Sequence, residues 1–261
     1  DTETALRLAP ILRPEAALAG AWEADAQDID VDLLLQGYVR LLRRRGGRIV
    51  SDARVEGLAR DGGIWRVETP AGAFSAPVVV DAAGAWADVV AERAGLAPLG
   101  LVPKRRSAAV LPAPEGHDVS RWPLFGSARE RWYARPMGGK LMVSPADQDP
   151  VAPHDAWPDD MVLAEGLHRY EQSTTVPVTR VERSWAGLRT FAPDKTPVVG
   201  FDPRAEGFFW LAGQGGYGVQ TAPALSRLAA DLLLGRAPGL AAPVVAALAP
   251  ARLVSPSRES V

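Results

Sequence analysis

The sequence contains no cysteine and only three histidines, and these scarcities exclude several kinds of site. Without cysteine the chain can form no disulfide, no thiolate metal site and no cysteine nucleophile. His117, His154 and His168 lie too far apart in the sequence to match the short ligand spacings of metal sites. No metal site is therefore predicted.

The sequence also lacks a large net charge and long apolar runs. The net charge is -2, which gives no reason to expect nucleic acid or an acidic membrane as a partner. No apolar run approaches the ~20 residues of a membrane-spanning helix, and no basic stretch followed by an apolar core marks a signal peptide at the N-terminus. The sequence therefore favours a cytoplasmic protein without a membrane span.

The composition that remains is that of a globular protein, with 47% hydrophobic and 23% charged residues in 261. Apolar periodicity and turn residues predict helices and strands in alternation. The expected helices cover residues 4–12, 31–45 (capped by Asp30, with Val31, Leu34, Leu35, Tyr38, Leu41 and Leu42 on one face), 85–94, 161–170 (capped by Asp160) and a run after residue 218. The expected strands cover residues 48–50, 53–59, 64–69, a stretch around Phe74, 77–81, 101–111, 132–136, 140–144, 178–188, 197–200 and 208–212, with an extended arm or strand at 18–23.

This order predicts a mixed α/β fold with two interleaved halves. An α/β layer comprises residues 1–97 and 190–235, an antiparallel sheet with a helix comprises residues 98–189, and a ligand is expected where they meet. Residues 236–261, rich in Ala and Pro, are predicted to form a tail whose last part is disordered.

The stretch from residue 207 to 235 organises this prediction. An apolar strand runs into Gly213, Gly215, Gly216 and Gly218, and leucines at helical spacing follow, with Gly235 as a C-cap. A helix that begins at such a turn presents unpaired amides and a positive dipole end, which suit an anion or an electron-rich ring. The glycines spell G-x-G-x-x-G, but no second strand with an acidic residue follows, so the pyrophosphate fingerprint is not assigned. A glycine-rich turn without a ligand is the alternative.

Three stretches resemble the C-terminal signature of the D-amino-acid-oxidase-like flavoproteins, which include glycine oxidase, sarcosine oxidase and D-amino-acid dehydrogenases. They are residues 185–189 (W-A-G-L-R), 193–200 and 213–223. The segment V-V-V-D-A-A-G-A-W resembles a second turn of the family that contacts the dinucleotide. The resemblance implies an FAD-binding layer interleaved with a substrate domain, and non-covalent FAD, since a cysteine-linked flavin is excluded.

The resemblance also implies roles for particular residues. The cofactor-binding set is expected to contain Val55, Ala83, Gly84, Trp86, Gly187, Gly213, Gly215, Gly216, Tyr217, Gly218, Val219 and Gln220. The arginine of the G-L-R step, Arg189, is expected to bind a substrate carboxylate through its planar fork.

Tyr133 and Arg135 alternate on one predicted strand, and the resemblance places them at the substrate. Simpler alternatives remain open for these residues. Arg189 could form a structural ion pair, Tyr133 could be a half-buried strand aromatic, and Trp86 could belong to the core. Asp194 and Lys195 read as turn-forming residues.

The family's N-terminal strand, dinucleotide turn and helix have no counterpart in this sequence. We therefore expect a piece of a longer protein, a gene fragment, or a subunit whose partner chain supplies the dinucleotide-binding segment, and weak or no FAD binding by this chain alone. The functional expectation is oxidation of a small amino acid or secondary amine by hydride transfer to flavin. The alternatives are dehydrogenation of a 2-hydroxy acid or polyol phosphate, and a non-catalytic fragment or subunit of a hetero-oligomeric dehydrogenase.

Overall fold

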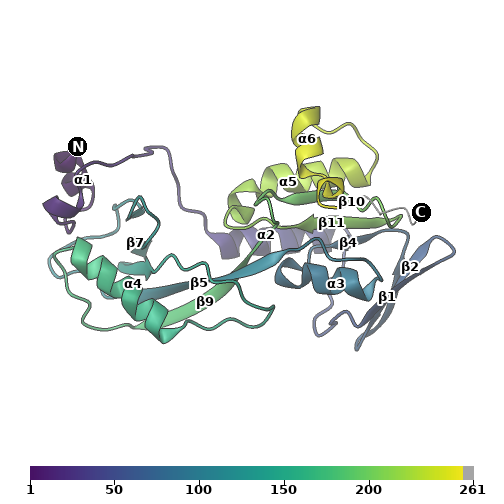
Figure 1. Cartoon of the computed structure of the whole chain (residues 1–261), viewed down its shortest axis with the longest axis horizontal. Helices are drawn as coiled ribbons and strands as arrows, with labels where there is room; N and C mark the ends of the chain where they lie inside the picture. The colour runs from purple at the N-terminus through teal and green to yellow at the C-terminus, as the bar shows by residue number, and fades with distance from the viewer. Residues whose placement is uncertain (255–261) are drawn as a thin grey trace, which may run out of the picture. The chain divides into compact units, whose positions relative to one another are not determined.

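The structure is a computed structural model that describes residues 1–254, and the chain divides into two compact units (Figure 1). Unit 1 joins Asp1–Ala26 to Pro103–Leu188, and unit 2 joins Gln27–Val102 to the chain from Arg189 onward. The first 26 residues thus belong with the antiparallel sheet, whereas the sequence placed them with the α/β layer. The end of the predicted tail, residues 255–261, lies outside the described residues.

Unit 1 is built on a five-stranded sheet with the strand order β6-β7-β8-β5-β9. Strands β7 and β8 form an antiparallel hairpin, and β5 pairs antiparallel with β8. The elements of this part of the chain are α1 (Thr2–Leu8), a 3₁₀ turn (Pro14–Ala16), β5 (Val102–Leu111), β6 (Phe125–Gly126), β7 (Tyr133–Met137), β8 (Lys140–Ser144), α4 (Asp160–Ser173) and β9 (Arg183–Phe191).

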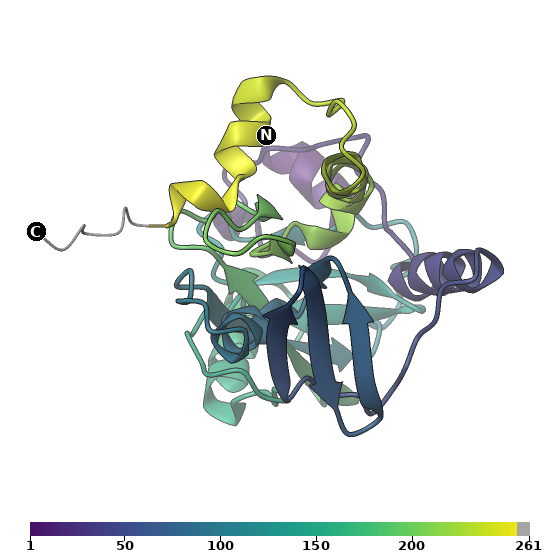
Figure 2. The same cartoon turned by 90° about the vertical axis from the view of Figure 1, so that its right-hand side faces the viewer.

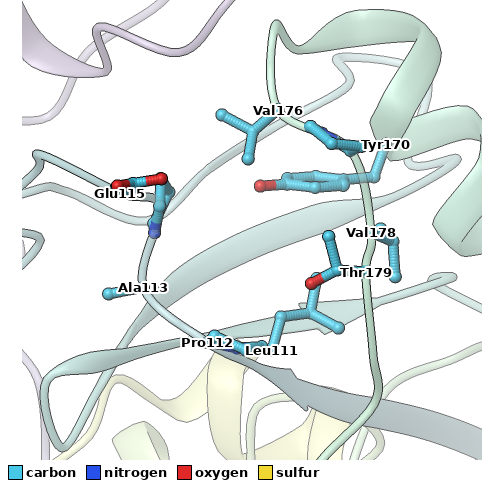
Figure 3. A pocket seen from close by; sticks show the side chains of 10 residues that line it. Leu111, Pro112, Ala113, Glu115, Tyr170, Val176, Val178 and Thr179 are labelled. Carbon is cyan, nitrogen blue, oxygen red and sulfur yellow. The ribbon is translucent and has the colours of Figure 1, made fainter.

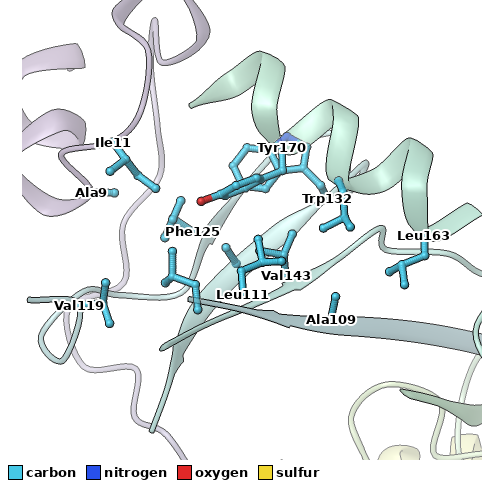
Figure 4. Packing of buried hydrophobic residues seen from close by; sticks show 13 residues of the cluster. Ala9, Ile11, Ala109, Leu111, Val119, Phe125, Trp132, Val143, Leu163 and Tyr170 are labelled. Carbon is cyan, nitrogen blue, oxygen red and sulfur yellow. The ribbon is translucent and has the colours of Figure 1, made fainter. Parts of the chain in front are cut away.

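Apolar side chains from α4 and from one face of this sheet form the core of unit 1 (Figure 4). The rings of Trp132 and Tyr170 meet edge to face with centroids 5.5 Å apart, an arrangement that aromatic quadrupoles favour. Ile11 is fully buried in the same core, and its carbonyl accepts a hydrogen bond from the amide of Thr175 at 2.7 Å. This burial explains why the N-terminal segment belongs to unit 1.

Unit 2 contains two three-stranded sheets, ordered β1-β2-β3 and β10-β11-β4. The first is antiparallel, while in the second β11 runs antiparallel to β10 and parallel to β4. Its elements are α2 (Val31–Arg44), β1 (Gly57–Asp61), β2 (Ile64–Thr69), β3 (Gly72–Ala76), β4 (Val79–Asp81), a 3₁₀ turn (Gly84–Trp86), α3 (Ala87–Arg93), β10 (Val198–Phe201), β11 (Phe208–Ala212), α5 (Gly218–Leu233), α6 (Ala242–Leu248) and a 3₁₀ turn (Pro250–Arg252).

Strand β11 is buried on both faces, which explains its continuous apolar sequence. Phe208 and Trp210 pack in the core that includes α3 and the β1–β2 hairpin. Phe209 points to the opposite face and packs in the core formed with α5 and α6. Figure 1 shows α5 and α6 on one side of this sheet and α3 on the other. The mixed α/β fold predicted from the sequence is confirmed.

Helix α2 has no buried residue, although its sequence is strongly amphipathic. The side chain of Asp30 caps it, as predicted, by accepting from the amide of Leu33 at 2.9 Å. Its expected core-facing side is open, with Val31 and Leu35 49% and 56% exposed. Figure 2 shows α2 at the right, standing apart from the two sheets of unit 2.

Several predicted elements differ in the structure. Residues 18–23 and 48–56 form no strand, and Asp159, not Asp160, caps α4. The predicted tail contains α6 and a 3₁₀ turn within residues 236–254. The three consecutive valines of the predicted strand at residues 77–81 are typical of a buried strand. In the structure, however, β4 lies at the edge of its sheet and Val80 is 41% exposed.

Candidate functional site

The glycine turn between β11 and α5 is anchored on the end of β9. Gly213 and Gly215 have φ angles of 70° and 56°, a region that side-chain-bearing residues rarely adopt. The amide of Gly215 donates to the carbonyl oxygen of Thr190 at 2.8 Å, and Gln214 forms a β-bridge with Phe191. The turn therefore lies beside the strand end that carries Arg189.

Two of the glycines also have close neighbours. A Cβ atom at Gly215 would lie 2.5 Å from Cε1 of Phe191, and a Cβ at Gly216 would lie 3.3 Å from Nη1 of Arg189. The guanidinium of Arg189 thus lies against the backbone of the turn. This juxtaposition places a cationic fork beside the glycine turn within unit 2.

Helix α5 begins at Gly218 without a side-chain cap. Tyr217 occupies the N-cap position, and its carbonyl accepts from the amide of Thr221. The amides of Gly218, Val219 and Gln220 form the first turn of the helix, where the dipole is positive. Because Tyr217 is 61% exposed and Val219 41% exposed, this helix end is open to a ligand.

The small-residue turn after β4 is the second predicted cofactor contact. Oδ1 of Asp81 accepts from the amide of Ala83 at 3.1 Å and so holds the first residue of the turn. Gly84 has a φ of 58°, and a Cβ there would meet no atom within 4 Å, which leaves open space at this position. Trp86 is 43% exposed, so it is not a core residue.

Asp81 is a buried acid for which the sequence predicted no role. Only 2% of it is exposed, and its Oδ2 has no hydrogen-bond partner among the described residues. Burial raises the pKa of Asp81 to about 7, although the Ala83 amide opposes this and nearby Asp88 adds to it. The available signal was a single acid at the end of an otherwise apolar strand.

Val55 and Gly187, the two remaining cofactor candidates, have simple surroundings. Val55 is partly buried and packs on the core of unit 2 that contains β1, β2 and α3. Gly187 lies on the part of β9 that belongs to unit 1, and a Cβ there would meet no atom within 4 Å.

Tyr133 and Arg135 share one face of β7 in unit 1. Ala134 between them points into the core and is fully buried, so both candidates lie on the opposite face. Arg106, which the sequence reading missed, places its guanidinium carbon 5.8 Å from the centroid of the Tyr133 ring. Its Nε also donates to the carbonyl oxygen of Asp147 at 2.8 Å, so this face of the sheet carries two arginines and a tyrosine.

Asp194 and Lys195 form a turn, in line with the sequence reading. The Asp194 carboxylate accepts from Nε of Arg252 at 2.7 Å and from the amide of Thr196 at 3.0 Å. The Arg252 hydrogen bond lowers the pKa of Asp194. Lys195 has a φ of 62°, a turn conformation.

Within residues 1–254, no group of three or more His, Asp or Glu side chains is arranged to bind a metal ion. None of the helices in that range combines the length and apolar character needed to span a bilayer.

Comparison with known proteins identifies a family and several similar proteins. Residues 1–232 match the family described as FAD dependent oxidoreductase. Glycine oxidase from Bacillus subtilis (strain 168) is 28% identical over 222 residues, which cover 80% of this chain and 56% of that enzyme. The chain therefore spans little more than half the length of this relative.

Solved structures show the same fold. The crystal structure of glycine oxidase from Geobacillus kaustophilus matches with a TM-score of 0.79 and 24% identity, over 93% of this chain and 64% of that one. The L-alpha-glycerophosphate oxidase from Mycoplasma pneumoniae, solved with FAD bound, matches with a TM-score of 0.71 and 21% identity, over 90% of this chain and 63% of the other. This chain belongs to the FAD-dependent oxidoreductase family, whose cofactor is FAD.

Proposed function

We propose that this chain forms the flavin-ring and substrate-binding part of an oxidoreductase that oxidises a small amino acid or a secondary amine. The observation that carries the proposal is the guanidinium of Arg189 against Gly216, beside the uncapped start of α5. An arginine fork suits a carboxylate, and a bare helix end suits an electron-rich ring. Both ligands would then meet at one turn.

The residues of the turn fit a flavin on physical grounds. Bound FAD supplies the hydride acceptor for oxidation of the amine to an imine. The absence of side chains at Gly215 and Gly216 leaves room for the Phe191 ring and the Arg189 guanidinium, which pack against the turn beside the start of α5. The positive end of α5, at Gly218 to Gln220, would stabilise negative charge on a ring edge placed there.

We also propose roles for the individual residues. Arg189 would hold the substrate carboxylate and so orient the reacting carbon–hydrogen bond. Ala83, Gly84, Trp86, Val55, Gly187 and Tyr217 stay proposed cofactor contacts, and Tyr133 and Arg135 stay proposed substrate contacts, on the strength of the sequence resemblance. We propose no metal in this chemistry.

Substitution of Arg189 tests the proposal. Arg189→Lys keeps the charge but loses the two parallel hydrogen bonds, so KM for a carboxylate substrate should rise about tenfold or more. The assay would use the chain completed by a dinucleotide-binding segment and loaded with FAD, with glycine, sarcosine and D-alanine as substrates and a dye as electron acceptor. Arg183→Lys is the matched control, because Arg183 lies on the same strand and stacks on Trp185 at 5.5 Å. Equal kinetics for both variants would reject the role of Arg189.

A 2-hydroxy acid or a polyol phosphate is the second candidate substrate. The match to a glycerophosphate oxidase favours it, and a guanidinium binds phosphate as well as carboxylate. Turnover of glycolate or glycerol 3-phosphate, with none of the amines, would favour this candidate over the first. A third candidate is a non-catalytic fragment or a subunit of a hetero-oligomeric dehydrogenase, which would turn over neither class.

We further propose that a dinucleotide-binding segment, from the same polypeptide or from a partner chain, completes the sheet of unit 2. Support comes from the edge position of β4, which has β11 on one side and an exposed Val80. The exposed apolar face of α2 is a second surface that such a segment would cover. Co-purification of this chain with a partner that carries a G-x-G-x-x-G turn would support the proposal.

A further inference from the structure

Unit 1 contains a cavity of about 260 Å³ that the proposed oxidation does not use. Its volume equals roughly eight or nine water molecules, which is enough for a compact organic molecule. The cavity lies between the end of β5, the C-terminal part of α4 and the segment that follows α4 (Figure 3). All of its lining residues belong to unit 1: Leu111, Pro112, Ala113, Pro114, Glu115, Tyr170, Val176, Pro177, Val178 and Thr179.

The lining combines an apolar surface with acceptors of hydrogen bonds. Figure 3 shows the hydroxyl groups of Tyr170 and Thr179 directed into the cavity, with the carboxylate of Glu115 across from them. No lysine, arginine or histidine lines the cavity. Glu115 has no hydrogen bond or ion pair with any residue of the described chain. The one formal charge in the lining is therefore negative, and because Glu115 is exposed, only solvent screens it.

Backbone donors are also scarce around this cavity. Three of its lining residues are prolines, which have no N–H group. The amide of Val178 is already committed, because it donates to Oε1 of Glu171 at 2.7 Å. Glu171 adds further negative potential beside Tyr170, whose pKa burial raises to about 12 so that the phenol remains neutral. An anion would find few partners here, whereas a cation would find several acceptors.

We propose that this cavity binds a primary ammonium group carried on a compact apolar body. The ammonium would donate to the Glu115 carboxylate and to the hydroxyl oxygen of Tyr170, and the apolar body would contact Leu111, Val176 and Val178. A ligand that also carries a carboxylate is excluded, since Glu115 would repel it. The site thus differs in ligand class from the carboxylate-binding turn at Arg189, and it requires neither FAD nor Arg189.

Three matched probes test this proposal by isothermal titration of the whole chain: 2-phenylethylammonium, 2-phenylethanol and L-phenylalanine. The first has the ammonium and the apolar ring, the second lacks the charge, and the third adds a carboxylate. We expect saturable binding of 2-phenylethylammonium and at least fivefold weaker binding of the other two. Equal binding of the alcohol, or no binding of the ammonium, would overturn the proposal.

Variants locate the binding. Glu115→Gln should weaken binding of 2-phenylethylammonium about fivefold or more, and Tyr170→Phe should weaken it about twofold while keeping the buried ring. Asp118→Asn is the control, because Asp118 is an exposed carboxylate in the same loop but outside the lining, and its affinity should match that of the wild type. Affinity lost equally in Asp118→Asn and Glu115→Gln would mean non-specific attraction and would reject the site. Thermal melts of each variant check that the fold is retained.

Discussion

Two buried aspartates of unit 2 have opposite electrostatic surroundings. Asp81 has one oxygen bonded to an amide and one with no partner among residues 1–254, and its pKa is raised to about 7. For Asp202, burial raises the pKa, but hydrogen bonds from Arg204 and from Nε1 of Trp210 outweigh burial and lower it. Neutralising the two side chains should therefore change stability in opposite directions.

Asp81→Asn should stabilise the chain at pH 8. In the folded state Asp81 holds its proton up to about pH 7, whereas the unfolded chain releases it near 3.8. The stability that protonated Asp81 contributes is therefore complete below pH 3.8 and is lost as pH rises to about 7. At ~1.4 kcal/mol per pKa unit, this loss is at most about 4 kcal/mol. Asparagine keeps an oxygen that accepts from the Ala83 amide, and because it does not ionise, it shows no such loss of stability. Urea unfolding from pH 4 to 8 should show a flatter pH dependence in the variant.

Asp202→Asn provides the comparison of opposite sign. Because the pKa of Asp202 is lowered in the folded state, its carboxylate stabilises above the unfolded pKa, and this is lost as pH falls through the folded value. Removal of the charge leaves Arg204 without its partner and should cost about 2 kcal/mol at pH 7. If both variants shift stability in the same direction, the assigned surroundings of Asp81 are wrong.

Gly215 and Gly216 should respond differently to alanine. At Gly215 an added Cβ meets both an unfavourable positive φ and the Phe191 ring at 2.5 Å, so Gly215→Ala should destabilise by about 2 kcal/mol or more. At Gly216 the Cβ meets only the flexible Arg189 side chain, at 3.3 Å. Gly216→Ala should cost less than 1 kcal/mol or so in unfolding but displace the guanidinium and weaken carboxylate binding. Chemical unfolding and inhibitor titration would separate the two effects.

At the scale of elements, the sequence predicted local structure where pattern and packing agree. The boundaries of β11 match the predicted strand at 208–212, and Asp30 caps α2 as expected. The sequence could not predict that residues 48–56 form no strand, because strand pairing depends on a neighbour that apolar periodicity does not identify. Nor did the sequence indicate α6, because its alanines and single proline resemble a linker composition.

Helix α2 has an amphipathic sequence, but its apolar face is not buried. Its apolar residues are exposed in this chain, so substituting Leu33 and Leu35 by glutamine should change the free energy of unfolding by less than about 0.5 kcal/mol. Phe209→Ala, in the core with α5, should cost about 3–5 kcal/mol by comparison. Loss of stability in the glutamine variant would show that α2 packs within this chain and would remove one support for a covering segment.

At the scale of the whole molecule, the candidate site could be predicted only in part. The glycine turn and Arg189 are 24 or more residues apart in sequence but adjacent in unit 2, and only the family resemblance linked them. Neither periodicity nor spacing could place Arg106 beside Tyr133, because β5 and β7 are separate strands of the sheet. The orphaned oxygen of Asp81 depends on packing that no local pattern encodes.

Within its described residues, the chain alone lacks neighbours for two of the surfaces in unit 2. The turn at residues 213–218, proposed to meet the flavin ring, is preorganised. Strand β4, however, is an edge strand and α2 is uncovered, so the surfaces proposed to hold the rest of the dinucleotide lack a neighbouring strand in unit 2. We expect the purified chain to bind FAD weakly or not at all, so gel filtration should strip the flavin absorption band from it. The chain unfolded in urea serves as the baseline for non-specific carry-over. A stoichiometric flavin that survives gel filtration would mean that residues 1–254 already supply every contact FAD needs, and the covering segment would then have no role in cofactor binding.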